Sequence, residues 1–354
     1  MSDPAATPEA AERRGRLLGI QLRALVAEHL GDPDLSADLG GFPRGAALTV
    51  DGSAWVLIDG PATRSLGGAL AWAVRHEVTE LHVIATADTG TLARRAERFA
   101  FPISVWFAQG RTLLPAVGEP LIEPRSPSAE HLDVSELIEA AGAVRNIEHG
   151  VVFGEVRGLE VCRVVDEPTI GHIAELGDVG LDAGGGFMPS LPMGVQLEVG
   201  VGANDREAFR LIHGEIPTIE ALASVVDAVS THRSIEARQH PLNRLGQERF
   251  LRWRLEQDPS LVGLTSVVAA EPPSPRPNLK DPIPCVASGL GRAGTSITIV
   301  CSVGVDLDLV GFVADVQTRS PGPVMVVLPT RDLMPITREL LGLLADPVEV
   351  VAVD

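Results

Sequence analysis

Apolar positions recur with a helical spacing near the start of the chain and then alternate between strand-like and helix-like runs. The first series has the three- to four-residue spacing of an amphipathic helix and consists of Leu17, Leu18, Leu22, Leu25, Val26 and Leu30. Two short apolar runs follow at residues 46–50 and 54–58, and the turn Asp51-Gly52-Ser53 between them predicts a hairpin. The pattern then predicts a helix, a strand, a helix and a strand at residues 66–75, 81–85, 91–99 and 103–107. This order predicts a mixed sheet flanked by helices.

A proline-rich segment interrupts this pattern at residues 115–130, where four prolines and no hydrophobic period predict a linker. Beyond it, the last part of the chain repeats the order strand, helix, strand, helix, strand. We therefore expect an α/β fold of two tandem mixed-sheet units. The first is residues 1–114, and the second is residues 131–354 with a helical insertion at residues 203–257.

The composition narrows the classes of function that the chain could have. Lys280 is the only lysine among 29 basic residues, which excludes the Gly-Lys-Ser/Thr phosphate loop and disfavours Schiff-base enzymes. A net charge of -18 disfavours a dedicated nucleic-acid or anionic-membrane binder. The 3 cysteines lack the spacing of a zinc site, and no apolar run is long enough to span a membrane. We expect a cytoplasmic protein without a cofactor.

The first unit contains the run Val56-Leu57-Ile58-Asp59 followed by the predicted helix that begins Leu66-Gly67-Gly68-Ala69-Leu70-Ala71. In this run and in its order of elements, residues 11–114 resemble the restriction-endonuclease-like, or PD-(D/E)XK, fold. The resemblance implies two strand carboxylates that bind a divalent metal ion, and Asp51 and Asp59 are the candidates. It also implies a lysine two positions after the second carboxylate, where this chain has Pro61. The resemblance with that departure implies a copy of the fold that does not cleave.

Three glutamates lie on predicted strands of the second unit. Glu198 alternates with apolar neighbours, so its side chain is a candidate to face a cleft, either as a catalytic residue or as a metal ligand. Glu155 and Glu160 flank the predicted turn at Arg157-Gly158, where we expect exposed side chains.

An arginine-rich segment at residues 232–254 carries six arginines and two acidic residues. Arg244, Arg249 and Arg252 are the candidates for binding an anionic partner such as a nucleic acid. The alternative is that these arginines pair with carboxylates of the same protein.

Two hypotheses of function follow. The favoured one is a non-catalytic binding or scaffold protein on a nuclease-like fold. The alternative is a metal-dependent hydrolase, which requires two or three carboxylates to converge within about 5 Å on one cation.

Overall fold

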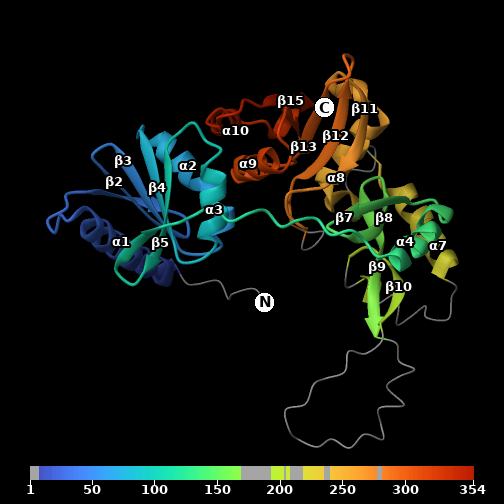
Figure 1. The fold of residues 1–354 in the computed structure, drawn as a ribbon, viewed down its shortest axis with the longest axis horizontal. Helices are drawn as coiled ribbons and strands as arrows, with labels where there is room; N and C mark the ends of the chain where they lie inside the picture. Colours follow the sequence, from blue (N-terminus) through green and yellow to red (C-terminus); the bar gives the residue numbers. More distant parts are fainter. Residues whose placement is uncertain (1–7, 169–192, 203–204, 208–217, 235–239, 277–280) are drawn as a thin grey trace, which may run out of the picture. The chain divides into compact units, whose positions relative to one another are not determined.

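The chain is mixed α/β, as its sequence predicts, in a computed structural model that describes residues 8–168, 193–202, 205–207, 218–234, 240–276 and 281–354 (Figure 1). It divides into two units. Unit 1 consists of Met1–Ile122 together with Gly289–Asp354, and unit 2 of Glu123–Ser288. No helix in the described residues is long and apolar enough to cross a membrane.

The division between the units differs from the predicted one. The break after Ile122 falls inside the predicted linker, but residues 289–354 belong to unit 1 and not to a second unit of residues 131–354. Buried ion pairs account for this difference. Arg94 and Arg95 of α3 (Thr89–Ala96) donate to the two carboxylate oxygens of Asp315 on α9 (Leu309–Arg319), at 3.1 and 2.8 Å. Such contacts between distant segments leave no trace in the local sequence pattern.

Unit 1 contains a six-stranded sheet whose strands lie in chain order. They are β1 (Asp38–Phe42), β2 (Gly45–Val50), β3 (Ser53–Ile58), β4 (Glu80–Ala85), β5 (Ile103–Gln109) and β6 (Thr112–Pro115). The neighbours β3, β4 and β5 are parallel, and the other pairs are antiparallel. The predicted hairpin is β2 and β3, and Asp51 and Gly52 form its turn.

The helices of unit 1 cover both faces of this sheet (Figure 1). The first helix, α1 (Pro8–Leu30), packs Leu22, Leu25 and Val26 against Trp55 and other apolar side chains on one face. The two connections between parallel strands contain α2 (Leu66–Arg75) and α3, which lie on the other face. Short 3-10 turns, η1 (Ala62–Arg64) and η5 (Thr330–Asp332), follow β3 and β14.

The carboxyl-terminal part of unit 1 has the predicted order of strand, helix, strand, helix, strand. Its strands β13 (Ser296–Cys301), β14 (Val324–Pro329) and β15 (Glu349–Val353) are parallel neighbours connected by α9 and α10 (Pro335–Leu341). They belong to a sheet of order β11-β12-β13-β14-β15. Its first strand, β11 (Leu264–Ala270), lies in unit 2, and the boundary between the units falls within β12 (Cys285–Gly291).

Unit 2 is built on a four-stranded antiparallel sheet of order β10-β9-β8-β7. Its strands are β7 (Val144–Glu148), β8 (Val151–Val156), β9 (Leu159–Pro168) and β10 (Met193–Val199). The helices are α4 (Ala129–Ala140), α7 (Thr218–His232) and α8 (Gln247–Gln257), with 3-10 turns η3 (Pro241–Arg244) and η4 (Pro259–Val262). Both α7 and α8 fall within the helical insertion predicted at residues 203–257.

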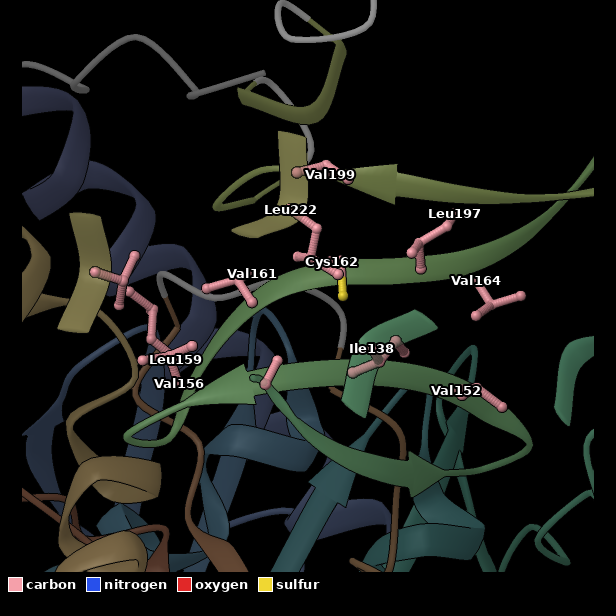
Figure 2. Close-up of a cluster of buried hydrophobic side chains, with 12 residues drawn as sticks. Ile138, Val152, Val156, Leu159, Val161, Cys162, Val164, Leu197, Val199 and Leu222 are labelled. Carbon is pink, nitrogen blue, oxygen red and sulfur yellow. The ribbon is translucent and has the colours of Figure 1, made fainter. Parts of the chain in front are cut away.

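One face of this sheet is apolar and packs against α4 and α7. Figure 2 shows Ile138 of α4 and Leu222 of α7 among buried side chains from β8, β9 and β10, including Cys162. The tight approach of α4 leaves no room for a side chain at Gly154, where a Cβ atom would lie 2.6 Å from the Ile138 side chain. The opposite face carries charged side chains together with the buried ring of Phe153.

Candidate functional site: a buried row of carboxylates

The polar face of the unit 2 sheet carries one glutamate from each of its four strands. We call Glu148 of β7, Glu155 of β8, Glu160 of β9 and Glu198 of β10 the carboxylate row. Antiparallel register places residues that are directly paired on the same face of a sheet. Glu155 pairs with Glu160, and Glu198 pairs with Arg163, so these side chains lie on one face.

A β-bulge brings Glu160 onto this face. The register between β8 and β9 shifts at Gly154 and Glu155, so that Gly154 pairs with Cys162 while Glu155 pairs with Glu160. Val161 is the extra residue between those two pairs. Without the bulge, Glu160 would point to the apolar face together with Cys162, because successive side chains alternate between the faces of a strand.

Burial of the carboxylate row is nearly complete at its centre. Glu155 is 3% exposed and Glu160 is 1% exposed, so the expectation that these two residues are exposed beside a turn is wrong. The backbone of α8 covers the turn, and a Cβ atom at Gly158 would lie 2.2 Å from the Arg249 carbonyl oxygen. Glu198 lies nearer the rim, with 26% of its side chain exposed.

Two arginines of α8 neutralise the centre of the row. Arg249 Nη1 lies 3.2 Å from Glu155 Oε1 and 3.7 Å from Glu160 Oε2, and its Nη2 donates to Glu148. Arg252 Nη2 donates to Glu155 Oε2, and Arg252 Nε lies 3.0 Å from Glu256 Oε1. Asn146 Nδ2 also donates to Glu155, at 2.8 Å. The guanidinium groups thus bridge carboxylates from three strands.

Two further arginines neutralise the other end of the row. Arg206 donates to Glu160 and to Glu198, both at 3.1 Å. Arg163 forms two parallel hydrogen bonds with Glu160, at 2.8 and 3.0 Å, which is the strong bidentate geometry. Each glutamate of the row therefore has at least one arginine partner.

The protonation states follow from this arrangement. Burial opposes the charge on Arg252, but the neighbouring acidic groups, Glu155 foremost, together outweigh it and raise the pKa of Arg252 above its ordinary value. The pKa of Arg249 is raised in the same way. Burial raises the pKa of Glu256, at the edge of the cluster. Arg249 and Arg252 are therefore held as cations across the physiological pH range.

The predicted anion-binding arginines do not form an exposed face. Arg249 and Arg252 are 2% and 1% exposed, and their anionic partners are the carboxylates of unit 2 itself. Arg244, in η3, is exposed. Arg233, from the same segment, is also buried, and its guanidinium donates to the carbonyl groups of Arg157, Leu242, Leu245 and Gly246. Burial lowers the pKa of Arg233 to about 10.

Within unit 1, the structure does not bring the candidate carboxylates Asp51 and Asp59 together. Asp51 is an exposed turn residue before β3, and Asp59 follows the end of the same strand. The 6 residues of β3 lie between them, and that strand alone spans ~20 Å at the rise of a β-strand. The Asp59 carboxylate accepts a hydrogen bond from Arg14 at 2.5 Å, and Glu198 belongs to unit 2.

The surroundings of Asp51, Asp59 and Glu198 do not form a metal centre in the part of the chain that the structure describes. Among the described residues, no group of three or more His, Cys, Asp or Glu side chains is arranged to hold a metal ion. Asp51 and Asp38 do line a shallow polar depression of about 280 Å³ beside the β2–β3 turn. The convergence of carboxylates that a metal-dependent hydrolase requires is not observed there.

Glu148 of the carboxylate row and Arg206, which donates to Glu160 and Glu198 of that row, were not identified from the sequence. Glu148 ends an edge strand that has no apolar alternation. Arg206 follows β10 in a helical segment, where its neighbours Asp205 and Glu207 are both acidic. The available signal was the arginine spacing on α8, because Arg249 and Arg252 are three positions apart and share one face of the helix.

Comparisons of this chain with protein-family models, with curated proteins and with solved structures found no match. The fold and the carboxylate row are therefore interpreted from their own geometry.

Proposed function

We propose that the chain is a non-catalytic binding or scaffold protein, built in part on a degenerate nuclease-like unit. The observation that carries the proposal is the neutralisation of its candidate carboxylates. Asp59 is paired with Arg14, and Glu198 with Arg206. A carboxylate that is already held by a guanidinium must lose that partner before it can bind a hard cation.

The alternative of a metal-dependent hydrolase has less support. A two-metal or one-metal hydrolase needs carboxylates that meet at one point, together with a group that positions the attacking water. Asp51 and Asp59 stand at opposite ends of β3, and Pro61 occupies the position of the lysine. The resemblance to nucleases therefore supports a use of the fold for binding.

The proposal does not extend to a nucleic-acid partner through residues 232–254. Such a partner needs several exposed cations to replace its counterions. Arg249 and Arg252 are committed to Glu155 and its neighbours. A cytoplasmic location remains part of the proposal, and the three cysteines, which are buried and free, support it.

The decisive experiment measures metal binding and cleavage together. The purified protein, incubated with Mg²⁺ or Mn²⁺ and with labelled single- and double-stranded DNA and RNA, is expected to leave every substrate intact. Calorimetric titration with Mn²⁺ is expected to show no site that Asp59→Asn or Glu198→Gln removes. The Arg14→Gln variant is a matched control for the role of this ion pair, because Arg14 is an exposed residue of α1 and its replacement removes the partner of Asp59. Mn²⁺ binding by this variant is compared with binding by the unmodified protein.

Two outcomes would overturn the proposal. One is metal-dependent cleavage that Asp59→Asn or Glu198→Gln abolishes. The other is a stoichiometric Mn²⁺ site in the unmodified protein that either variant removes.

A further inference from the structure

A second polar cluster lies in unit 1, on the face of the first sheet that α1 covers. Direct pairing between β3 and β4 places Ser53 beside Glu80 and Trp55 beside His82. Trp106 of β5 and His29, in the last turn of α1, complete the cluster. Trp55 and Trp106 pack within the apolar core of this face, and 13% of the His82 side chain is exposed.

The hydrogen bonds of the cluster determine the tautomer of His82. An indole N–H can only donate, so the contact of 3.1 Å between Trp106 Nε1 and His82 Nδ1 requires an unprotonated Nδ1. The proton of the neutral ring is then on Nε2, which faces Glu80 Oε1 at 3.5 Å. Glu80 is fixed in turn by a hydrogen bond from the Ser53 hydroxyl at 2.5 Å.

Ring contacts hold the same side chains in place. The His82 ring is stacked on Trp55, with centroids 3.8 Å apart and an interplanar angle of 7°. The His29 ring meets Trp106 edge to face at 4.5 Å. Movement of Trp106 would therefore break its hydrogen bond with His82 and its ring contact with His29 at the end of α1.

We propose that His82 is a proton-controlled latch, which holds Trp106 while its imidazole is neutral and releases it when the imidazole gains a proton. The reason is geometric. A second proton must go to Nδ1, where it would point at the indole N–H, and two donors cannot share one hydrogen bond. Release of Trp106 loosens the packing beneath the last turn of α1, which carries His29 and Leu30.

The surroundings of His82 set the pH range. The titratable groups that face it are Glu80 on its own strand and His29 on α1, while β3 and β5 contribute Ser53, Trp55 and Trp106. Burial lowers the pKa of His82, and Glu80 works in the opposite direction. The Ser53 hydroxyl lowers the pKa of Glu80, so that carboxylate stays ionised while His82 titrates. The latch therefore opens below the ordinary histidine pKa of about 6.5.

Nuclear magnetic resonance of the intact protein tests this directly. In ¹⁵N-labelled protein at pH 8, the histidine nitrogen shifts are expected to show His82 protonated on Nε2 alone. On acidification, the indole N–H resonance of Trp106 is expected to shift and to exchange faster with water. Its midpoint should equal that of His82 and lie below about 6.5. Trp106→Phe assigns the resonance among the 4 tryptophans.

Two variants separate His82 from its neighbour. In His82→Asn the amide oxygen takes the place of Nδ1 as an acceptor but does not titrate, so the Trp106 resonance is expected to become independent of pH. In His29→Gln the transition is expected to remain.

If His82 carries its proton on Nδ1 at pH 8, or if Trp106 does not respond when His82 titrates, the latch is refuted. A transition that disappears in His29→Gln and survives in His82→Asn also refutes it. The tautomer measurement and the pH titration of Trp106 on the unmodified protein together decide the matter even if a variant does not fold.

Discussion

Removal of a single charged side chain from the carboxylate row or its arginine partners is expected to change the stability of unit 2 strongly. A buried ion pair contributes little net stability, because the cost of removing both charges from water offsets their attraction. Removal of one partner is different, because it leaves the other charge buried and uncompensated, which costs about 3–5 kcal/mol. Arg249 contacts Glu148, Glu155 and Glu160, so its loss would expose three carboxylates to one another.

We therefore expect Arg249→Met to lower the free energy of unfolding of unit 2 by about 3–5 kcal/mol. Arg244→Met is the matched control, because Arg244 is an exposed arginine of the same segment, and its effect should stay within about 0.5 kcal/mol. Urea unfolding, followed by circular dichroism, gives both values. A contrary result would be an Arg249→Met variant that keeps its stability and loses affinity for a labelled oligonucleotide, since this would mean that the arginine faces solvent.

The sequence indicated the components of this site better than their arrangement. It identified strand glutamates and an arginine-rich segment, and it included pairing within the protein as the alternative to binding an outside anion. It placed Glu155 and Glu160 in solvent because they flank the predicted turn at Arg157-Gly158. That inference failed because α8, from a distant part of the chain, covers the turn. Local periodicity contains no information on such long-range coverage.

At the scale of elements, the amino-terminal end of α2 lies directly against the backbone that precedes α9. The Gly67 amide donates to Asp308 Oδ1 at 3.2 Å, and a Cβ atom at Gly67 would lie 1.9 Å from the Leu307 carbonyl oxygen. Because of this contact, α2 tolerates only glycine at position 67. Burial, followed by the charge of Asp306, raises the pKa of Asp308 to about 6.

Two neighbouring glycines of α2 make this a sharp test. Gly67→Ala is expected to lower the free energy of unfolding of unit 1 by about 1–3 kcal/mol, because the new methyl group collides with backbone atoms. Gly68→Ala meets nothing closer than Phe42 at 3.8 Å, so it should raise stability by up to about 1 kcal/mol through helix propensity. Thermal and urea unfolding of the two variants measure the difference. Equal effects would mean that α2 does not approach Leu307 this closely.

The elements that the sequence predicted are those with a strong apolar period. The hairpin of β2 and β3 and the helix α2 agree with the predicted residues to within one position at each end. The sequence did not predict β1, β6, β7, β11 or β12, and all of these except β12 are edge strands of their sheets. Edge strands lack the continuous burial that produces alternation, and β1 contains Gly40 and Gly41.

At the scale of the whole molecule, unit 1 is assembled from two segments that are far apart in the sequence. Asp315, in the second segment, is 2% exposed and satisfies Arg94 and Arg95 of the first. A backbone bridge between Phe99 and Leu344 joins the same segments. Residues 1–122 alone would leave Arg94 without its buried partner.

The fragment of residues 1–122 is therefore expected to be unstable alone and to become folded when residues 289–354 are expressed with it. Dispersed amide resonances and a cooperative thermal transition would report folding. The full-length chain provides the reference for both signals. If residues 1–122 melt cooperatively without the second segment, then the amino-terminal domain predicted from the sequence is autonomous.

The β-bulge at Val161 has a consequence for the order of folding. It places Glu155 directly opposite Glu160 across a two-residue connection, the kind of hairpin that forms within microseconds in an isolated peptide. In water both carboxylates are solvated and the hairpin can open and close freely. Its native, dehydrated form needs Arg252, which is 97 positions from Glu155 in the chain. The buried form of this local hairpin is therefore stable only after α8 has packed on it, and that step has the slower rate of closing a long loop.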